Sequence, residues 1–464
     1  MEITENYSKF QALRKEYPLF IYESFHLNWQ KNGLILDFVF SAGEKYTFRP
    51  QIFFPAEKKK LNSIPGPVLH SLAYHIGMVE MISYWKAFCC PCILIKPFYL
   101  DGAGQDWWKK LFIHGLGEFF YTNGIPVPGE EILDFEFDDN AKKLPGAFEL
   151  SNASDQVLIP VGGGKDSAVT LELLKKYHPK NVALVVNHRG ATRQVLEVAG
   201  FESERIVEVK RSLDPLLLDL NKMGFLNGHT PFSALLAFVS LFYSCLVGLR
   251  HIALSNESSA NEPSIPGTKI NHQYSKSFEF EKDFRSYTES HICKNSNYFS
   301  FLRPLNELQI AGLFSGLKSY HWVFKSCNAG SKTDSWCCRC SKCLFTWIIL
   351  SPFLPPEELQ EIFGTDLFAD GDLVGLLDQL TGTAANKPFE CVGTLEEVNA
   401  ALVMAVNKRI RKKEPLPELL EHYRRQQVYQ NYQGSDFAGL LKKFEKPHFL
   451  EKPFARLLHE ALNL

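Results

Sequence analysis

Residues 156–176 read QVLIPVGGGKDSAVTLELLKK, and this stretch decides the expected fold. An apolar, β-branched run is followed by three glycines, then by Lys165, Asp166 and Ser167, and then by a segment with helical periodicity. Glycine lets the backbone turn tightly and brings N–H groups close to an anion. The positive end of the following helix dipole adds to the attraction. The stretch therefore predicts a strand, a turn and a helix that together hold phosphate.

The spacing of this turn excludes two common phosphate-binding loops. A Walker loop needs Ser or Thr directly after its Lys, but Asp166 follows Lys165. A dinucleotide-binding turn needs a third glycine where Ser167 stands. Gly-Gly-x-Asp-Ser after a strand instead resembles the pyrophosphate loop of ATP-pyrophosphatases, which cut ATP into AMP and pyrophosphate to activate a carbonyl or carboxylate. The usual first Ser of that loop is Gly162 here. An ordinary glycine-rich turn is the alternative.

Apolar strands and helical segments alternate from residue 156 onward, which is typical of a doubly wound α/β domain with a parallel sheet. Strands are expected at 156–161, 182–187, 205–210, 251–256 and 320–325, and helices at 167–177, 191–199, 231–249 and 308–319. Polar residues follow several of the strands, where such sheets bind their ligands. The sequence thus predicts the adenine-nucleotide hydrolase fold of the pyrophosphate-loop proteins.

We expect three regions in this chain of 464 residues. Residues 1–148 are rich in aromatic residues and predict an N-terminal α+β domain. Residues 149–355 form the expected ATP-binding domain, and residues 356–464 form a helical region with helices at 357–363, 373–380 and 395–406. The N-terminal domain is the candidate for binding the part of the substrate that does not react.

Composition excludes some classes of partner. The formal net charge of −2 leaves no basic surplus for a nucleic-acid backbone. The longest apolar run, 231–249, contains three serines and leads directly into another apolar run, so a buried helix is expected rather than a membrane span. The first 14 residues are polar and charged, unlike a signal peptide. We therefore expect a cytoplasmic protein with no nucleic-acid or membrane partner.

The cysteines indicate a metal site. Cys337, Cys340 and Cys343 have CxxC spacing, and Cys327 follows the last expected strand. Four thiolates suit tetrahedral Zn²⁺ with no open position, which is a structural site, and Cys338 is then a spare thiol. A catalytic dithiol of a thiolating enzyme and plain buried cysteines are the alternatives.

Three polar strings complete the candidate chemistry: NGHTP at 227–231, SNESSANEP at 255–263 and NHQYSKSFEFEKDF at 271–284. Taken with GGGKDS, they resemble the ATP-dependent UDP-N-acetylmuramoyl-L-alanyl-L-glutamate epimerases of bacterial cell-wall synthesis. The resemblance extends to GLGEFFYTNGI (115–125), WCCRCSKCLFTWIILSPFL (336–354) and KPFECVGTLEEVNAAL (387–402). It covers most of the chain in the same order, and the family also has Gly at the position of Gly162.

The resemblance implies that UDP-MurNAc-L-Ala-L-Glu is converted to its D-Glu epimer while ATP becomes AMP and pyrophosphate. Adenylation removes the charge of the glutamyl carboxylate, so that the carbanion formed at Cα can be delocalised as an enolate. Another carboxylate-adenylating enzyme that makes an amide or nitrile is the alternative, as is a nucleotide-binding regulator without activity.

The site residues are predicted in four groups. The phosphates of ATP are expected at Gly162, Gly163, Gly164, Lys165 and Ser167, with Mg²⁺ at Asp166 and the rest of the nucleotide near Asn187 and Arg189. Substrate or Mg²⁺ is expected at Asn256, Glu257, Asn261 and Glu262. Proton transfer is expected from His229, His272, Tyr274 or Lys276, with the face of each undecided. A structural Zn²⁺ is expected at Cys327, Cys337, Cys340 and Cys343.

Overall fold

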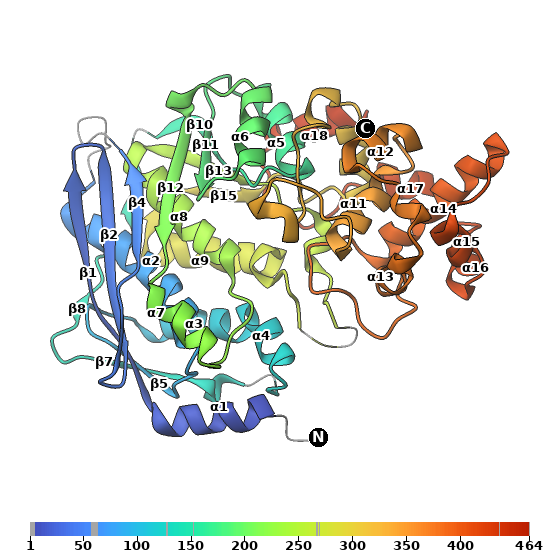
Figure 1. Ribbon diagram of the computed structural model, residues 1–464. Helices are drawn as coiled ribbons and strands as arrows, with labels where there is room; N and C mark the ends of the chain where they lie inside the picture. The colour runs from blue at the N-terminus through green and yellow to red at the C-terminus, as the bar shows by residue number, and fades with distance from the viewer. Residues whose placement is uncertain are drawn as a thin grey trace. The chain divides into compact units, whose positions relative to one another are not determined.

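The computed structural model describes residues 5–56, 64–126, 129–151, 153–265, 268, 270–435 and 437–463. It has a mixed α/β fold with a large sheet and a C-terminal region of helices (Figure 1), which confirms the expected class at this level. In the described part of the chain the sheet has eleven strands; ten run in the order β15-β13-β10-β11-β12-β4-β2-β1-β5-β7, and β3 pairs with β2.

The chain divides into two compact units, each built from separate stretches of sequence. The first unit comprises Met1–Leu158, Val207–Ile252 and Lys269–Tyr298. The second unit comprises Ile159–Ile206, Ala253–Thr268 and Phe299–Leu464. The expected division at residues 148 and 355 stays a prediction.

The first unit is built on a long hairpin. Strands β1 (Leu19–Gln30) and β2 (Gly33–Ala42) pair antiparallel. On one side of the hairpin, β5 (Cys92–Ile95) lies parallel to β1 and β7 (Asp134–Phe137) lies parallel to β5. On the other side, β4 (Gln51–Pro55) is antiparallel to β2, and β12 (Ile206–Ser212) is antiparallel to β4. The sheet is therefore mixed in strand direction. The short strand β3 spans Tyr46–Phe48.

Helix α2 (Gly66–Trp85) lies in the core of this unit, and every residue from 71 to 85 is buried. A helix that is apolar on all sides is typical of such a position. A β-carbon at Gly77 would lie 1.8 Å from the Tyr22 hydroxyl, so glycine is what allows α2 to approach β1. The unit also contains the helices α1 (Glu5–Glu16), α3 (Gly102–Gly115), α4 (Gly117–Thr122), α7 (Pro215–Lys222), α8 (Phe232–Val247) and α9 (Phe278–His291).

The glycine-rich stretch folds as strand, turn and helix. Strand β10 (Ser154–Pro160) pairs parallel with β13 (Leu249–Leu254) and leads into α5 (Lys165–Lys175). Strand β11 (Val182–Val186) and α6 (Gly190–Val198) follow in the second unit. All of these elements were expected, with ends that differ by at most two residues.

The expected strand at 320–325 is wrong. This segment forms a 3₁₀ turn, η6 (Lys318–Tyr320), followed by further turns. Its backbone bonds are local: Tyr320 N–H donates to Leu317 O at 2.9 Å and Phe324 N–H donates to Tyr320 O at 3.0 Å. The aromatic and β-branched residues favour a strand, but they serve here as anchors of a compact turn. Lys325 N–H still bonds Gly163 O at 3.1 Å, so the segment contacts the glycine-rich loop.

The chain from residue 356 onward is helical in the described residues, as expected. The helices predicted at 357–363, 373–380 and 395–406 correspond to α12 (Pro356–Phe363), α13 (Val374–Thr381) and α14 (Leu395–Lys412). The other helices of the second unit are α10 (Glu307–Ser315), α11 (Ser341–Leu350), α15 (Glu418–Arg424), α16 (Gln427–Tyr432), α17 (Phe437–Lys442) and α18 (Lys452–Leu462).

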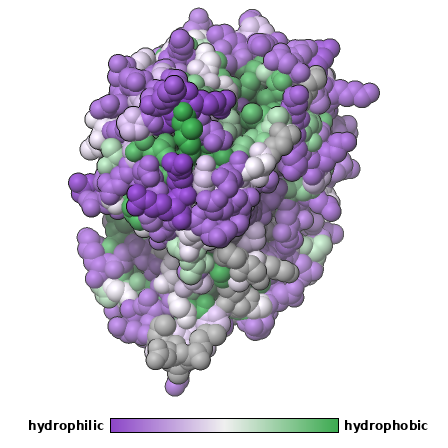
Figure 2. Space-filling view, turned by 90° about the vertical axis from the view of Figure 1, so that its right-hand side faces the viewer, coloured by the Kyte–Doolittle hydropathy of each residue, from purple (hydrophilic) through white to green (hydrophobic). Residues whose placement is uncertain are grey.

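Hydrophilic side chains cover most of the face shown in Figure 2, with apolar side chains gathered in patches toward its top. Apolar patches between polar residues are ordinary for a folded protein surface. The apolar run at 231–249 forms α8, most of whose residues are buried. Within the described residues, no helix combines the length and apolar character that crossing a membrane requires.

Candidate functional site

The glycine-rich loop is shaped by close backbone contacts. Gly163 has a φ of +86°, and a β-carbon there would lie 2.9 Å from the Thr192 Cα. A side chain at this position would be strained and would clash, so glycine is required. Gly164 caps α5, and the Gly162 N–H donates to Ser167 Oγ at 3.2 Å. The loop thus places Lys165, Asp166 and Ser167 in the first turn of the helix.

Four side chains of the second unit form what we call the lysine–carboxylate cluster: Lys165, Asp166, Glu257 and Glu307. Lys165 is 3% exposed, and its Nζ donates to Asp166 and to Glu307. Glu307 is the first residue of α10 and Glu257 precedes a 3₁₀ turn, and both are buried. One oxygen from each of the three carboxylates lies within 4.8 Å of the others. The cluster therefore joins two predicted loop residues to two carboxylates from distant parts of the sequence.

The charges of this cluster do not balance internally. Burial raises the pKa of Glu307 to about 8, and Asp166 and Glu257 act in the same direction while Lys165 opposes it. Burial alone would lower the pKa of Lys165, but Asp166 and Glu307 raise it, so the ammonium stays charged. Near neutral pH Glu307 is then protonated, and a second cation beside Lys165 would favour its ionised form. Oxygen ligands of this kind suit Mg²⁺.

Hydrogen bonds hold the carboxylates in place. Glu397, buried in the first turn of α14, accepts from the Glu307 N–H at 2.7 Å. The side chain of Thr394 caps the same turn. Glu257 is fixed by Ser259, whose Oγ donates to Glu257 Oε1 at 3.0 Å, and by Arg303 Nη1, which donates to the Glu257 carbonyl at 2.5 Å. Helix ends and loops of the second unit thus converge on the cluster.

The other residues expected near nucleotide, substrate or Mg²⁺ have different surroundings. Glu262 pairs with Lys387 and lies outside the lysine–carboxylate cluster. Asn256 Nδ2 donates to Ser300 Oγ at 3.0 Å, and Asn261 is exposed on a 3₁₀ turn. Of the two expected carboxylates in SNESSANEP, the structure therefore brings only Glu257 to Asp166.

Asn187 and Arg189 follow β11 and are exposed. Arg189 caps α6, while the N–H groups of Gly190 and Ala191 donate to Asp334 at 3.1 and 3.0 Å. The N-terminus of α6 therefore already has an anionic partner from the chain itself. A role of these two residues in binding the nucleotide stays a prediction.

A second constellation lies in the first unit, and we call it the histidine–glutamate cluster: Glu118, His229 and His272. Glu118 lies on α4, His229 precedes α8, and His272 precedes the 3₁₀ turn η5 (Tyr274–Lys276). The Nδ1 atoms of both histidines face Glu118 Oε2, at 3.2 Å for His229 and in closer contact for His272. The two imidazole centroids are 4.7 Å apart, with their planes at 54°. Two of the four proton-transfer candidates therefore share one carboxylate.

The surroundings of this cluster tune its protonation. Burial lowers the pKa of His229 to about 4; His272, Lys86 and Lys276 act in the same direction, while Glu118 opposes them. Burial likewise lowers the pKa of Lys86 to about 8. Lys86 Nζ donates to the Gly228 carbonyl and, at 2.8 Å, to Thr230 Oγ1, so it fixes the loop that carries His229.

Tyr274 lies beside the cluster in sequence but is packed differently. Its ring is 7% exposed and lies 5.2 Å from the ring of His114 and 6.0 Å from that of Phe280, measured between centroids. Burial raises the pKa of the Tyr274 hydroxyl, which therefore stays protonated at neutral pH. The phenol can donate a proton but is a poor base.

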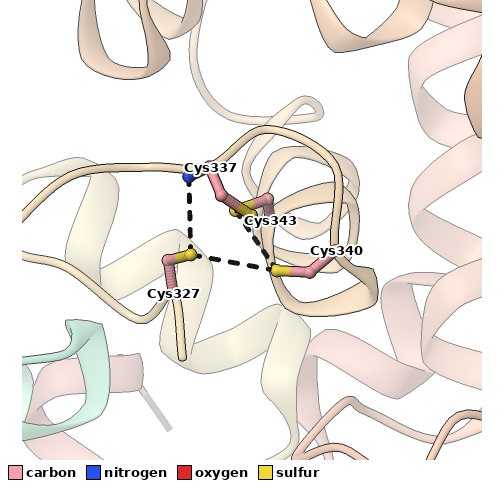
Figure 3. Close-up of side chains that lie close together, drawn as sticks. All are labelled: Cys327, Cys337, Cys340 and Cys343. Atoms are coloured by element: carbon pink, nitrogen blue, oxygen red, sulfur yellow. Dashed lines mark hydrogen bonds between the residues drawn. The ribbon is translucent and has the colours of Figure 1, made fainter. Parts of the chain in front are cut away.

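The four cysteines of the predicted metal site converge (Figure 3). The Sγ atoms of Cys327 and Cys340 are 3.9 Å apart, those of Cys337 and Cys343 are 3.8 Å apart, and those of Cys340 and Cys343 are 3.5 Å apart. Zn–S bonds of about 2.3 Å in a tetrahedron place the sulfur atoms about 3.8 Å apart. Cys338 lies apart from them, with its Sγ 3.3 Å from the Phe363 carbonyl. The spacing thus fits a tetrahedral thiolate site.

Sequence reasoning missed two carboxylates that the structure places at these sites. Glu307 follows an Asn in the first turn of a helix, where an acidic residue ordinarily favours the helix dipole. Glu118 also lies in a helical first turn, within the GLGEFFYTNGI string that carries part of the resemblance. Its membership of that string was the one available sign of a role.

Comparison with known proteins identifies relatives over most of the chain. Residues 11–301 match the family model described as the MurL N-terminal domain, and residues 323–433 match the MurL C-terminal domain. Three similar proteins are each named UDP-N-acetyl-alpha-D-muramoyl-L-alanyl-L-glutamate epimerase. The one from Micromonospora sp. is 33% identical over 82% of this chain and 86% of its own length. The one from Xanthomonas oryzae pv. oryzae is 33% identical over 72% and 74%. The one from Salinispora tropica is 35% identical over 70% and 71%. No solved structure matches the chain.

Proposed function

The chain belongs to the MurL family, and we propose that this epimerase inverts the glutamate of UDP-MurNAc-L-Ala-L-Glu in a reaction that converts ATP to AMP and pyrophosphate. The names of its relatives support the substrate and the isomerase activity. The lysine–carboxylate cluster beside a glycine-rich loop is the observation that supports the use of ATP.

Adenylation addresses the main chemical difficulty of the reaction. The Cα proton of a glutamyl carboxylate is very weakly acidic, because the carbanion would lie next to an existing negative charge. An acyl adenylate has lost that charge and can accept the electron pair as an enolate oxygen. Each 1.4 kcal/mol by which the transition state for proton removal is stabilised accelerates that step about tenfold. A return of the proton from the opposite face inverts the centre, and water then releases AMP.

The second unit offers the groups that such activation needs. The N–H groups of the glycine-rich loop and the start of α5 favour phosphate. Lys165 is a buried, charged ammonium that can compensate phosphate charge. Asp166, Glu257 and Glu307 would hold Mg²⁺, which supplies charge neutralisation for the leaving pyrophosphate. The pyrophosphate-loop fold type is part of this proposal.

We further propose that Cys327, Cys337, Cys340 and Cys343 hold one structural Zn²⁺. The sulfur–sulfur distances of 3.5–3.9 Å fit a closed tetrahedral site. Cys327 and Cys343 are buried, and Cys343 lies on α11. The metal would join the turn after residue 325 to the helical region of the second unit.

Incubation of the purified protein in D₂O with ATP, Mg²⁺ and UDP-MurNAc-L-Ala-L-Glu is expected to give D-Glu with one deuterium at Cα, together with AMP and pyrophosphate. Mass spectrometry and chiral analysis of the released glutamate measure this. Omission of ATP is expected to abolish both deuterium uptake and inversion. Formation of AMP with unlabelled L-Glu would instead favour a ligase that adenylates this carboxylate. Inversion without ATP would contradict the adenylate mechanism.

A further inference from the structure

Glu118 connects the two histidines of the histidine–glutamate cluster. Three strings that lie far apart in sequence, at 115–125, 227–231 and 271–284, each contribute one member. A single oxygen, Glu118 Oε2, faces Nδ1 of both rings. All three side chains are largely shielded from solvent, with side-chain exposures of 16–20% and 15% for His272. A carboxylate that faces two imidazoles in this way controls the orientation of both.

The spacing of the rings decides how they can act. Their centroids are 4.7 Å apart. A carbon atom held between two rings needs about 3.5 Å to each of them, or about 7 Å in all. No Cα atom therefore fits between the two ring planes. Because both Nδ1 atoms are directed at one oxygen of Glu118, this spacing favours action of the two rings from one face of the substrate.

The charges favour one shared proton. The cluster contains one carboxylate, which can compensate one imidazolium at a time. Among the described residues, the charged or titratable groups that most strongly affect the pKa of His229 are Glu118, His272, Lys86 and Lys276, and of these four Glu118 is the negative one. A second imidazolium beside the first would therefore be strongly disfavoured. The pair can cycle between a neutral state and a state with a single positive charge.

We propose that Glu118 is a positioning residue that holds His229 and His272 as one proton-exchange unit, which removes the glutamyl Cα proton from one face. This rests on the proposed epimerisation. With both Nδ1 atoms directed at Glu118, the proton moves through Nε2. The C–H electron pair passes to the acyl oxygen of the adenylate, and the imidazolium formed is compensated by Glu118. The opposite face receives its proton from a separate acid, for which Tyr274 and Lys276 remain the candidates.

Glu118→Gln is the sharpest test, because glutamine keeps the size and one acceptor oxygen but removes the charge. Deuterium exchange at Cα is expected to fall by about 10²-fold or more, as for loss of an assisted general base. Formation of AMP is expected to stay within about twofold of the wild-type rate. Without the negative charge an imidazolium is less stable, so the histidine pKa falls. The acidic limb of the exchange-rate profile is therefore expected to move to lower pH by about one unit.

Two further variants separate positioning from structure. Glu118→Asp keeps the charge and is expected to recover part of the exchange rate. Asp106→Asn removes an exposed carboxylate from α3 in the same unit and is expected to behave as wild type. Equal losses of AMP formation and exchange in Glu118→Gln, or unchanged exchange with an unmoved pH limb, would overturn the proposal. So would a stoichiometric divalent metal in the wild-type protein that this variant loses.

A readout without substrate keeps this test independent of the proposed function. Nitrogen-15 NMR of the histidines reports which ring nitrogen carries the proton at each pH. In the wild type, His229 and His272 are expected to carry Nδ1–H and to take up one proton between them before any second one. Glu118→Gln is expected to lower that first titration. If the wild type shows no Cα exchange, the proposed function fails; if it shows exchange but independent histidine titrations, only the role of Glu118 fails.

Discussion

Glu307→Gln is expected to lower the rate of AMP formation by about 10²–10³-fold, the size of effect seen when one preorganised electrostatic partner is removed from an active site. Glu307 is 2% exposed and supplies one of the three carboxylates that would hold Mg²⁺. It also accepts from Lys165, the ammonium proposed to compensate phosphate charge. The amide of glutamine fills the same space but has no negative charge to pair with Mg²⁺ or with Lys165. A titration of AMP formation against Mg²⁺ is expected to show a raised requirement for the metal.

The matched control is Glu197→Gln on α6, since the Glu197 side chain is 58% exposed and pairs with the exposed Arg193. That variant is expected to keep the wild-type rate, because exposed pairs of this kind contribute little. Far-ultraviolet circular dichroism and the thermal midpoint establish that Glu307→Gln remains folded. Wild-type AMP formation by a folded Glu307→Gln protein would show that the lysine–carboxylate cluster does not bind the nucleotide metal.

Single helices and turns could be predicted from the sequence because neighbouring residues in the chain largely determine them. Three glycines between an apolar run and a helical segment predicted the turn that leads into α5. The helix expected at 395–406 corresponds to α14, which in the structure begins with a Thr394–Glu397 capping box. Residues 320–325 misled the prediction, since β-propensity describes how a residue fits a pleated surface rather than an intrinsic backbone preference.

The pairing of distant strands could not be predicted in the same way. Strand β12 is antiparallel to β4, with Lys210 opposite Phe53. A doubly wound scheme assumes that strands pair through short crossover connections, and here the partner comes from much earlier in the chain. No local pattern in either strand states which other strand it will adjoin. The mixed direction of the sheet was therefore outside what periodicity can show.

In the candidate sites, too, local sequence patterns predicted some residues and did not reveal others. Lys165, Asp166 and Glu257 stood out because loops rich in polar residues follow strands. Glu118 and Glu307 lie in first helical turns, where acidic residues are common without any catalytic role. Their side-chain contacts distinguish them: Glu118 faces two imidazoles and Glu307 binds a buried lysine. Single carboxylates on helices are thus the residues that a sequence reading misses most readily.

Cys343→Ser is expected to lower bound zinc from about one ion per chain to nearly none and to destabilise the second unit strongly. Free energies of zinc binding at structural sites are on the order of 10–16 kcal/mol, and in such sites they contribute to folding. Cys343 is fully buried on α11, so a serine there also leaves a hydroxyl without the thiolate–metal bond. Elemental analysis of the purified variant and its thermal midpoint, expected to fall by more than about 10 °C, measure the two effects.

Cys338→Ser is the matched control, because Cys338 lies one residue from Cys337 but its Sγ contacts the Trp336 and Phe363 carbonyls rather than the other sulfur atoms. It is expected to keep zinc and to melt close to the wild type. Loss of zinc in both variants would show that the metal is bound elsewhere or less specifically. A wild-type protein that contains no zinc, yet melts as a stable fold, would show that the four thiols pack without a metal.

Removal of the metal is also expected to affect the glycine-rich loop. Cys327 Sγ accepts from the Gly330 N–H at 3.1 Å, so the turn after residue 325 should loosen first. That turn contacts the glycine-rich loop through Lys325. Zinc loss is therefore expected to reduce AMP formation even at temperatures where the protein remains folded.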